Sequence, residues 1–140
     1  MRSVRTVAFE LPVRLVVSHD LMVSMRVALR YEADDPYAVR AVFDPQGEGG
    51  TVEWFFSRDM LAQALSEHTG RGDVCMWPAG ESGRDVVYVV LRSPAGSALL
   101  EFPAQGVESF LRETWSVVPP GAESSRLDLD AELAQLLAEN

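Results

Sequence analysis

The residues best suited to chemistry stand in a short acidic run, "RYEADDPYAVRAVF", which spans residues 30–43. Glu32, Asp34 and Asp35 could bind a metal ion or act in acid–base catalysis if further ligands converged on them. The run lacks calcium-loop spacing and has no glycine for a tight ligand loop. Aspartate before Pro36 is instead typical of a turn, because its side chain bonds nearby backbone and proline presets φ. We interpret the run as a turn between two strands; a metal site and an exposed partner contact are the alternatives.

Nucleophilic chemistry has few candidates in this chain. Cys75 is the single cysteine, and His19 and His68 are the two histidines. A thiol and an imidazole can form a catalytic pair, but their spacing here does not favour one, and a free cysteine in a strand is usually a small buried hydrophobe. No Gly-x-Ser-x-Gly elbow is present. We therefore expect no catalytic residue, no metal and no cofactor, and hence no enzyme.

The composition excludes or disfavours further classes of protein. The chain has 140 residues, 47% of them hydrophobic, which fits a single domain over residues 1–140. All 12 basic residues are arginine, so mechanisms that need lysine are excluded. The net charge of -9 argues against general nucleic-acid binding, which depends on cations. The longest apolar run, residues 86–91, is far too short to cross a membrane, and the N-terminus is a poor signal peptide, so a cytoplasmic protein is expected.

Strands must position most of the candidate residues named above, because apolar and polar residues alternate with period two through most of the chain. Pro12 suits an edge position or a bulge within the first strand. Residues 86–91 are apolar at every position, so that strand is expected to be covered on both faces. The predicted strands span residues 7–17, 21–31, 37–44, 51–56, 73–77, 85–92 and 97–102.

Helical spacing interrupts the strands twice. Ser57 can cap a helix that carries apolar residues from Met60 to Leu65 and ends before glycine. Pro103 suits the first turn of a second helix. Its inward stripe consists of Val107, Phe110, Leu111, Thr114 and Val118. A further amphipathic helix is expected from about Leu129 to the end. The pattern predicts an α+β fold of two antiparallel strand blocks, each followed by a helix: ββββα-βββα plus a C-terminal helix.

Aromatic residues remain as candidates for a surface role. In "VEWFF", Trp54 and Phe55 fall on opposite faces of one strand, and "CMWP" places Trp77 in another. One face must belong to the core. The other is covered either by helices of the same chain or by a second subunit.

Several strings, taken in order, resemble the SsgA-like proteins of sporulating actinomycetes. They are "LRYEADDPYAV", "TVEWFFSRDML", "TGRGDVCMWP", "SPAGSALLEFPAQGVESFL" and "VPPGAE" followed by "LDLDAELAQLL", and the likeness runs from about residue 11 to the C-terminus. The resemblance implies control of cell division and cell-wall remodelling during sporulation, without enzymatic activity. One family member helps to position the tubulin-like division protein FtsZ at future septa. The implied fold is similar to the whirly fold of single-stranded nucleic-acid-binding proteins, and the implied assembly is a trimer.

The main hypothesis is a cytoplasmic adaptor at division septa that regulates sporulation-specific division by septum-site positioning, FtsZ recruitment or septal wall remodelling. Its partner would be FtsZ or an SsgA-like paralogue. The expected contacts are Trp54, Trp77, Leu99 and Glu123, the last as a fixed charge on the loop from Pro119 to Glu123, which "PPG" stiffens.

The alternative is a single-stranded nucleic-acid-binding protein. It would use an arginine stripe of Arg26, Arg30 and Arg40 on neighbouring strands. The residues leave the particular SsgA-like subfamily open.

Overall fold

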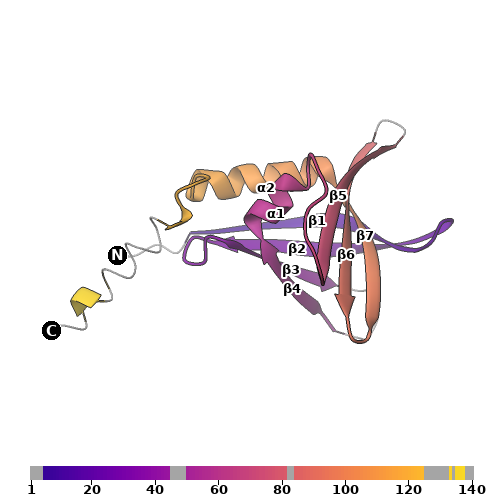
Figure 1. The fold of residues 1–140 in the computed structure, drawn as a ribbon, viewed down its shortest axis with the longest axis horizontal. Helices are drawn as coiled ribbons and strands as arrows, with labels where there is room; N and C mark the ends of the chain where they lie inside the picture. The colour runs from indigo at the N-terminus through magenta and orange to yellow at the C-terminus, as the bar shows by residue number, and fades with distance from the viewer. Residues whose placement is uncertain (1–4, 45–49, 82–83, 125–132, 134, 138–140) are drawn as a thin grey trace.

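The computed structural model describes residues 5–44, 50–81, 84–124, 133 and 135–137 (Figure 1). Its elements alternate in two blocks, as the sequence pattern predicts. The first block comprises β1 (Thr6–Ser18), β2 (Leu21–Glu32), β3 (Ala38–Asp44), β4 (Val52–Ser57) and α1 (Arg58–Gln63). The second comprises β5 (Val74–Glu81), β6 (Arg84–Ser93), β7 (Gly96–Pro103) and α2 (Ala104–Val117).

All seven strands join one antiparallel sheet in the order β4-β3-β2-β1-β7-β6-β5. The two blocks meet where β1 pairs with β7, through Arg14 with Glu101 and Leu15 with Leu100. The sheet is strongly curled, and both helices lie on the same side of it (Figure 1). We call the side that carries the helices the inner face and the opposite side the outer face.

The core lies between the inner face and α2. Paired residues of neighbouring strands share a face, so the pairs Leu11 with Val27 and Val87 with Phe102 place inner-face side chains of both blocks in the core. The predicted inward stripe of α2 is buried from Val107 to Val118, which confirms it. Gly106 allows close packing, because a Cβ atom there would lie 2.8 Å from a methyl carbon of Leu11.

Three expectations about single elements need correction. The first helix ends at Gln63, well before the glycines that were expected to end it. Pro12 was expected in an edge strand or at a bulge, but β1 lies in the middle of the sheet, between β2 and β7. Pro12 is outside the two residue pairs that join β1 to β7. The strand that contains residues 86–91 is covered by helix on the inner face alone: Val87 and Val89 are buried, whereas Val86 and Val90 on the outer face are half-buried. The C-terminal helix expected from Leu129 falls largely outside the described residues.

The acidic run forms the predicted turn between β2 and β3. Asp34 and Asp35 are exposed, and the backbone amide of Asp35 donates to the carbonyl of Glu32 at 2.9 Å. The hydroxyl of Tyr31 donates to the carbonyl of Pro36 at 3.0 Å, which fixes the turn to the core. Within the described part of the chain, no group of three or more His, Cys, Asp or Glu residues is placed to hold a metal ion.

Helix α1 begins with the predicted serine cap, which generates the first prediction. The hydroxyl of Ser57 accepts a hydrogen bond from the backbone amide of Met60 at 2.9 Å. Ser57→Ala should lower the free energy of unfolding by about 1 kcal/mol, because that amide loses its acceptor. Urea unfolding measures the change, with Ser66→Ala as the exposed control. Equal stability of the two variants would show that the cap does not stabilise α1.

Candidate functional site

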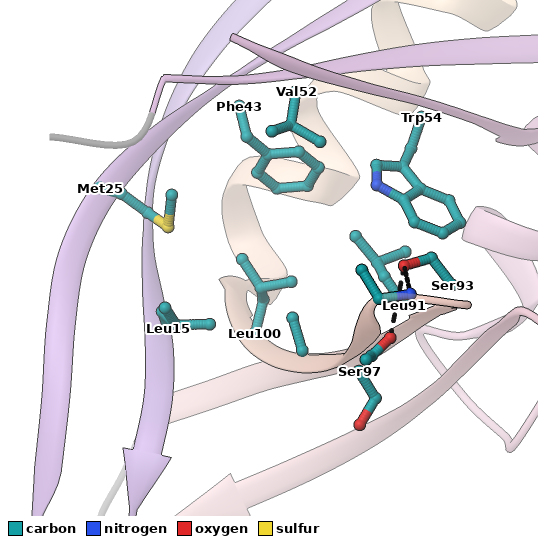
Figure 2. A pocket seen from close by; sticks show the side chains of 12 residues that line it. Leu15, Met25, Phe43, Val52, Trp54, Leu91, Ser93, Ser97 and Leu100 are labelled. Carbon is teal, nitrogen blue, oxygen red and sulfur yellow. Dashed lines mark hydrogen bonds between the residues drawn. The ribbon is translucent and has the colours of Figure 1, made fainter. Parts of the chain in front are cut away.

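An apolar groove occupies the part of the inner face that the helices leave uncovered. Figure 2 shows side chains from β3 and β4 facing side chains from β6 and β7 across it. Its volume is about 330 Å³, within the range of about 300–1,000 Å³ usual for ligand pockets. Its large apolar side chains are Leu15, Met25, Phe43, Val52, Trp54, Leu91 and Leu100. We refer to this set as the groove.

Curling of the sheet forms the groove. Trp54 lies on β4, at one edge of the sheet, and four strands separate it from Leu91 on β6. Both nevertheless line the same cavity, so the inner face is concave. The polar side chains among the described lining residues are Ser93 and Ser97. Such a lining favours burial of an apolar group, and it offers no charged side chain for acid–base chemistry.

A second apolar surface continues from the groove along the β1–β2 hairpin. Leu15, which lines the groove, pairs with Val23. Beyond this pair the hairpin extends past the rest of the sheet (Figure 1). Val17, Leu21, Met22 and Val23 are 55%, 52%, 38% and 42% exposed. We call residues 17–23 the arm. Contiguous exposed apolar side chains of this kind mark interaction surfaces.

The outer face carries a third, more aromatic surface. Trp77 pairs with Tyr88 across β5 and β6, and their ring centroids lie 5.7 Å apart. The exposed His68 stacks on Trp77 at 5.8 Å. Leu99 is half-buried on β7, opposite Val90. Of the contact residues predicted from sequence, the structure therefore places Trp77 and Leu99 on the outer face and Trp54 on the inner face.

A polar cluster on the outer face was not anticipated from sequence. Glu101 is 6% exposed, although it carries a charge. The Arg14 guanidinium donates to its Oε1 at 2.6 Å, and the Tyr88 hydroxyl is 3.2 Å from its Oε2. The cluster joins β1, β7 and β6, so it stabilises the junction of the two blocks. The sequence signal that could have indicated this cluster is the position of Glu101, an acidic residue among the apolar residues of its strand.

Glu123 does not present an exposed charge, which corrects the sequence expectation. Its side chain is 8% exposed, and its Oε2 accepts a hydrogen bond from Arg58 Nη2 at 2.6 Å. Arg58 is itself buried; it also donates to the carbonyl of Val118 at 2.7 Å and lies 4.8 Å above the Tyr31 ring. The carboxylate thus completes a buried ion pair, because an unpaired guanidinium there would be costly. Sequence reasoning missed Arg58, which looked like an ordinary first-turn residue.

The predicted arginine stripe exists on the outer face, but acids neutralise two of its members. Arg26 Nη1 lies 2.6 Å from Glu10, and Arg40 Nε lies 2.7 Å from Glu53. Arg30 pairs across the strands with Arg40. With these carboxylates interleaved, the stripe is a poor match for a phosphate backbone, which attracts uncompensated cations.

With this geometry in place, comparison with known proteins identifies the class. Residues 25–123 match the family model described as "Streptomyces sporulation and cell division protein, SsgA". The chain belongs to this SsgA family.

Similar relatives within the family are named sporulation-specific cell division protein SsgB. The protein from Streptomyces coelicolor is 50% identical over 96% of this chain and 98% of its own length. The one from Frankia casuarinae is 45% identical over 94% of this chain and 92% of its own.

Solved structures of similar proteins support the same family assignment. A structure concerned with SsgB mutations that correlate to longitudinal cell division during sporulation of S. coelicolor matches with a TM-score of 0.85 at 48% identity, covering 90% of this chain and 98% of that one. An SsgA-like protein from Thermobifida fusca matches with a TM-score of 0.87 at 36% identity, covering 96% and 98%. Among the described residues of this chain, no helix is long and apolar enough to span a membrane.

The buried pair gives a prediction about stability. Glu123→Ala leaves the Arg58 charge buried without its carboxylate, so the free energy of unfolding should fall by about 3 kcal/mol. Ser124→Ala, at the neighbouring exposed position, should change it by less than about 0.5 kcal/mol. The double variant Arg58→Met/Glu123→Leu should recover much of the loss, because no charge remains buried. Equal denaturation midpoints for Glu123→Ala and Ser124→Ala would contradict this account.

The same pair makes stability depend on pH. The hydrogen bond from Arg58 holds the pKa of the Glu123 carboxyl below its ordinary value of 4.5. A lowered pKa in the folded state stabilises the fold above pH 4.5, and this contribution is lost as the pH falls through the lowered pKa and Glu123 takes up a proton. Glu123→Gln should therefore show a smaller loss of stability below pH 4.5 than the unmodified chain. Identical acid profiles would exclude this linkage.

Proposed function

We propose that the protein is a non-enzymatic adaptor in sporulation-specific cell division, acting through protein–protein contacts. The observation that carries this proposal is the 50% identity, over 96% of the chain, to a sporulation-specific cell division protein. The apolar character of its open surfaces supports it. The groove and the arm offer apolar area for contacts, and the described lining of the groove includes no ionisable group.

The proposed partners are FtsZ or an SsgA-like paralogue, and the proposed place of action is the cytoplasm at division septa. Recruitment of FtsZ, septum-site positioning and septal wall remodelling are the possible modes. The outer-face surface around Leu99, Val90, Tyr88 and Trp77 is the proposed contact with the division protein, since its side chains are half-buried and apolar or aromatic. In this proposal Glu123 does not contact the partner directly, because its carboxylate pairs with the buried Arg58. It acts instead by holding the loop of residues 119–123 in place.

Assembly as a homotrimer, together with the whirly-like description of the fold, is part of the same proposal. The arm supports self-association, because its exposed apolar residues lie on both faces of a two-stranded hairpin that neither α1 nor α2 covers (Figure 1). The nucleic-acid alternative has less support. The net charge is -9, and Arg26 and Arg40 each face a carboxylate.

Partner binding can be tested on the outer face. Leu99→Asp places a charge in the apolar surface, so capture of purified FtsZ, or of a purified SsgA-like paralogue, should fall at least about tenfold, as for an interface hot spot. Ser24→Asp, exposed on the same face, should leave capture unchanged. Circular dichroism confirms that both variants are folded. Undiminished capture by folded Leu99→Asp would remove this surface from the proposal.

Assembly can be tested separately on the arm. Light scattering of the full chain should give a mass of about 46 kDa, three times the chain mass of 15.4 kDa. Leu21→Asp should shift the mass towards the monomer at micromolar concentration, because a carboxylate cannot be buried in an apolar contact without cost. His19→Asp, exposed at the turn of the arm, is the matched control. A monomeric unmodified chain would contradict the assembly proposal while leaving the partner proposal intact.

A further inference from the structure

The sheet has two edge strands, and the chain protects only one of them. An edge strand exposes unpaired backbone amides and carbonyls, which can pair with another polypeptide. At the β5 edge, the amide of Met76 donates to the carbonyl of Thr69 at 2.9 Å, and the amide of Thr69 donates to the carbonyl of Met76 at 2.8 Å. Pro78, two residues further along β5, has no amide hydrogen to donate. These residues close the β5 edge to a further strand.

Strand β4 forms the opposite edge, and its outward backbone groups are unpaired (Figure 1). The amide of Arg58 donates to the carbonyl of Tyr37 at 2.8 Å, which continues the ladder between β4 and β3. Alternate residues of an antiparallel strand direct their backbone groups to the same side. The groups of Trp54 therefore face β3, whereas those of Glu53 and Phe55 face away from the sheet. Among the described residues, no hydrogen bond reaches these outward amides and carbonyls.

The side chains on both faces of β4 leave this edge accessible. Phe55 is 56% exposed on the outer face, and Val52 is 47% exposed on the inner face, beside the groove. Charged residues and prolines often protect an edge strand. Strand β4 has no proline, and its one charged residue, Glu53, accepts a hydrogen bond from Arg40 Nε at 2.7 Å. An exposed apolar edge of this kind is suited to β-strand addition.

We propose that the β4 edge binds an extended segment of a partner protein, which adds to the sheet as a further strand. Hydrogen bonds to the backbone of Glu53 and Phe55 provide affinity, and alternate side chains of the segment provide specificity. Side chains that point to the inner face lie beside Val52 and Trp54, at a groove whose described lining contains no ionisable group. These positions of the segment are therefore apolar.

On the outer face, the charges beside the edge favour basic residues in the segment. Phe55 lines a small hollow of about 70 Å³ together with two acids and two arginines. The four charged residues are Glu32, Asp35, Arg30 and Arg40. Glu53 supplies a third carboxylate next to Phe55, so acids outnumber arginines here, and the whole chain carries a net charge of -9. Such a field attracts cations. The segment thus alternates apolar and basic residues.

Symmetry argues against a second copy of the chain as the occupant. Two β4 edges would pair about a two-fold axis, which a closed trimer does not contain. A ring in which β4 pairs with β5 of the next copy is blocked by Thr69 and Pro78. The chain's own residues 135–137 are helical and not extended. The inference deepens the proposed adaptor function and rests on it, including the trimer.

The test uses a synthetic fluorescent peptide that alternates valine and arginine over about eight residues, enough to span β4. Fluorescence anisotropy with the full chain should show saturable binding that weakens as salt is added. Two further peptides carry N-methyl groups on the valine nitrogens or on the arginine nitrogens. One of these two should lose binding and the other should keep it, because only one alternate set of amides faces β4.

A pair of chain variants tests the edge itself. Phe55→Pro removes the outward amide of residue 55 and spares the ladder with β3, which uses the backbone of Trp54 and Phe56. Phe55→Leu keeps the amide and an apolar side chain. The unmethylated peptide should bind Phe55→Pro at least about fivefold more weakly than Phe55→Leu, because a hydrogen bond is lost. Circular dichroism confirms that both variants are folded.

Three results would overturn the proposal: no saturable binding, equal binding of the two methylated peptides to the unmodified chain, or equal binding of the peptide to the two folded variants. A lower mass of Phe55→Pro than of Phe55→Leu in light scattering would assign the edge to a contact between copies, which also overturns it. Failure here is distinguishable from failure of the proposed function. Capture of FtsZ is tested at Leu99 on β7, and three strands separate β7 from β4.

Discussion

The main helix, α2, is too short to cover the long apolar inner face of the sheet. This difference in length leaves part of that face exposed. Strand β1 has 13 residues and α2 has 14. At about 3.3 Å per strand residue and 1.5 Å per helix residue, the strand is about twice as long as the helix. Figure 1 shows α2 running along β1 and β2 without reaching the end of the hairpin. The part of the inner face that α2 leaves uncovered forms the groove, and the arm beyond it exposes further apolar side chains.

The Arg58–Glu123 pair holds the two helices together at the covered end of the sheet. It links the start of α1 to the loop after α2, and its carbonyl contacts at Thr114 and Val118 fix the end of α2 against Tyr31. The covered end is thus held by a buried ion pair, whereas the open end is lined by apolar side chains that can exchange water for a partner. This division between a fixed end and an open end suits a protein whose relatives act in cell division and whose open surfaces offer apolar contact area.

Much of the fold could be predicted from the sequence, because local patterns determine local structure. Alternation located all the strands to within a few residues, and Ser57 and Pro103 marked the two helix starts. The acidic run was correctly assigned to a turn, since Asp-Pro chemistry is local. Asp34 and Asp35 are exposed on this turn.

The candidate site could be predicted only in part, because it depends on how distant strands meet. Trp54 was expected to be a surface residue, but its position opposite Leu91 requires the curl of the whole sheet. Glu123 was misjudged because its partner, Arg58, lies 65 residues away in sequence and carries no local signal. Trp77 and Leu99 were grouped with Trp54, although the sheet places them on the opposite face.

The most direct measurement is the accessibility of Trp54 in the assembled protein. With Trp77 and Trp115 replaced by phenylalanine, Trp54 becomes the single tryptophan, which can be excited separately from the three tyrosines. If the groove is covered by a partner or a second copy, acrylamide should quench Trp54 weakly in the concentrated protein and strongly after dilution. Equally strong quenching at every concentration would contradict the claim that the uncovered inner face is a binding surface.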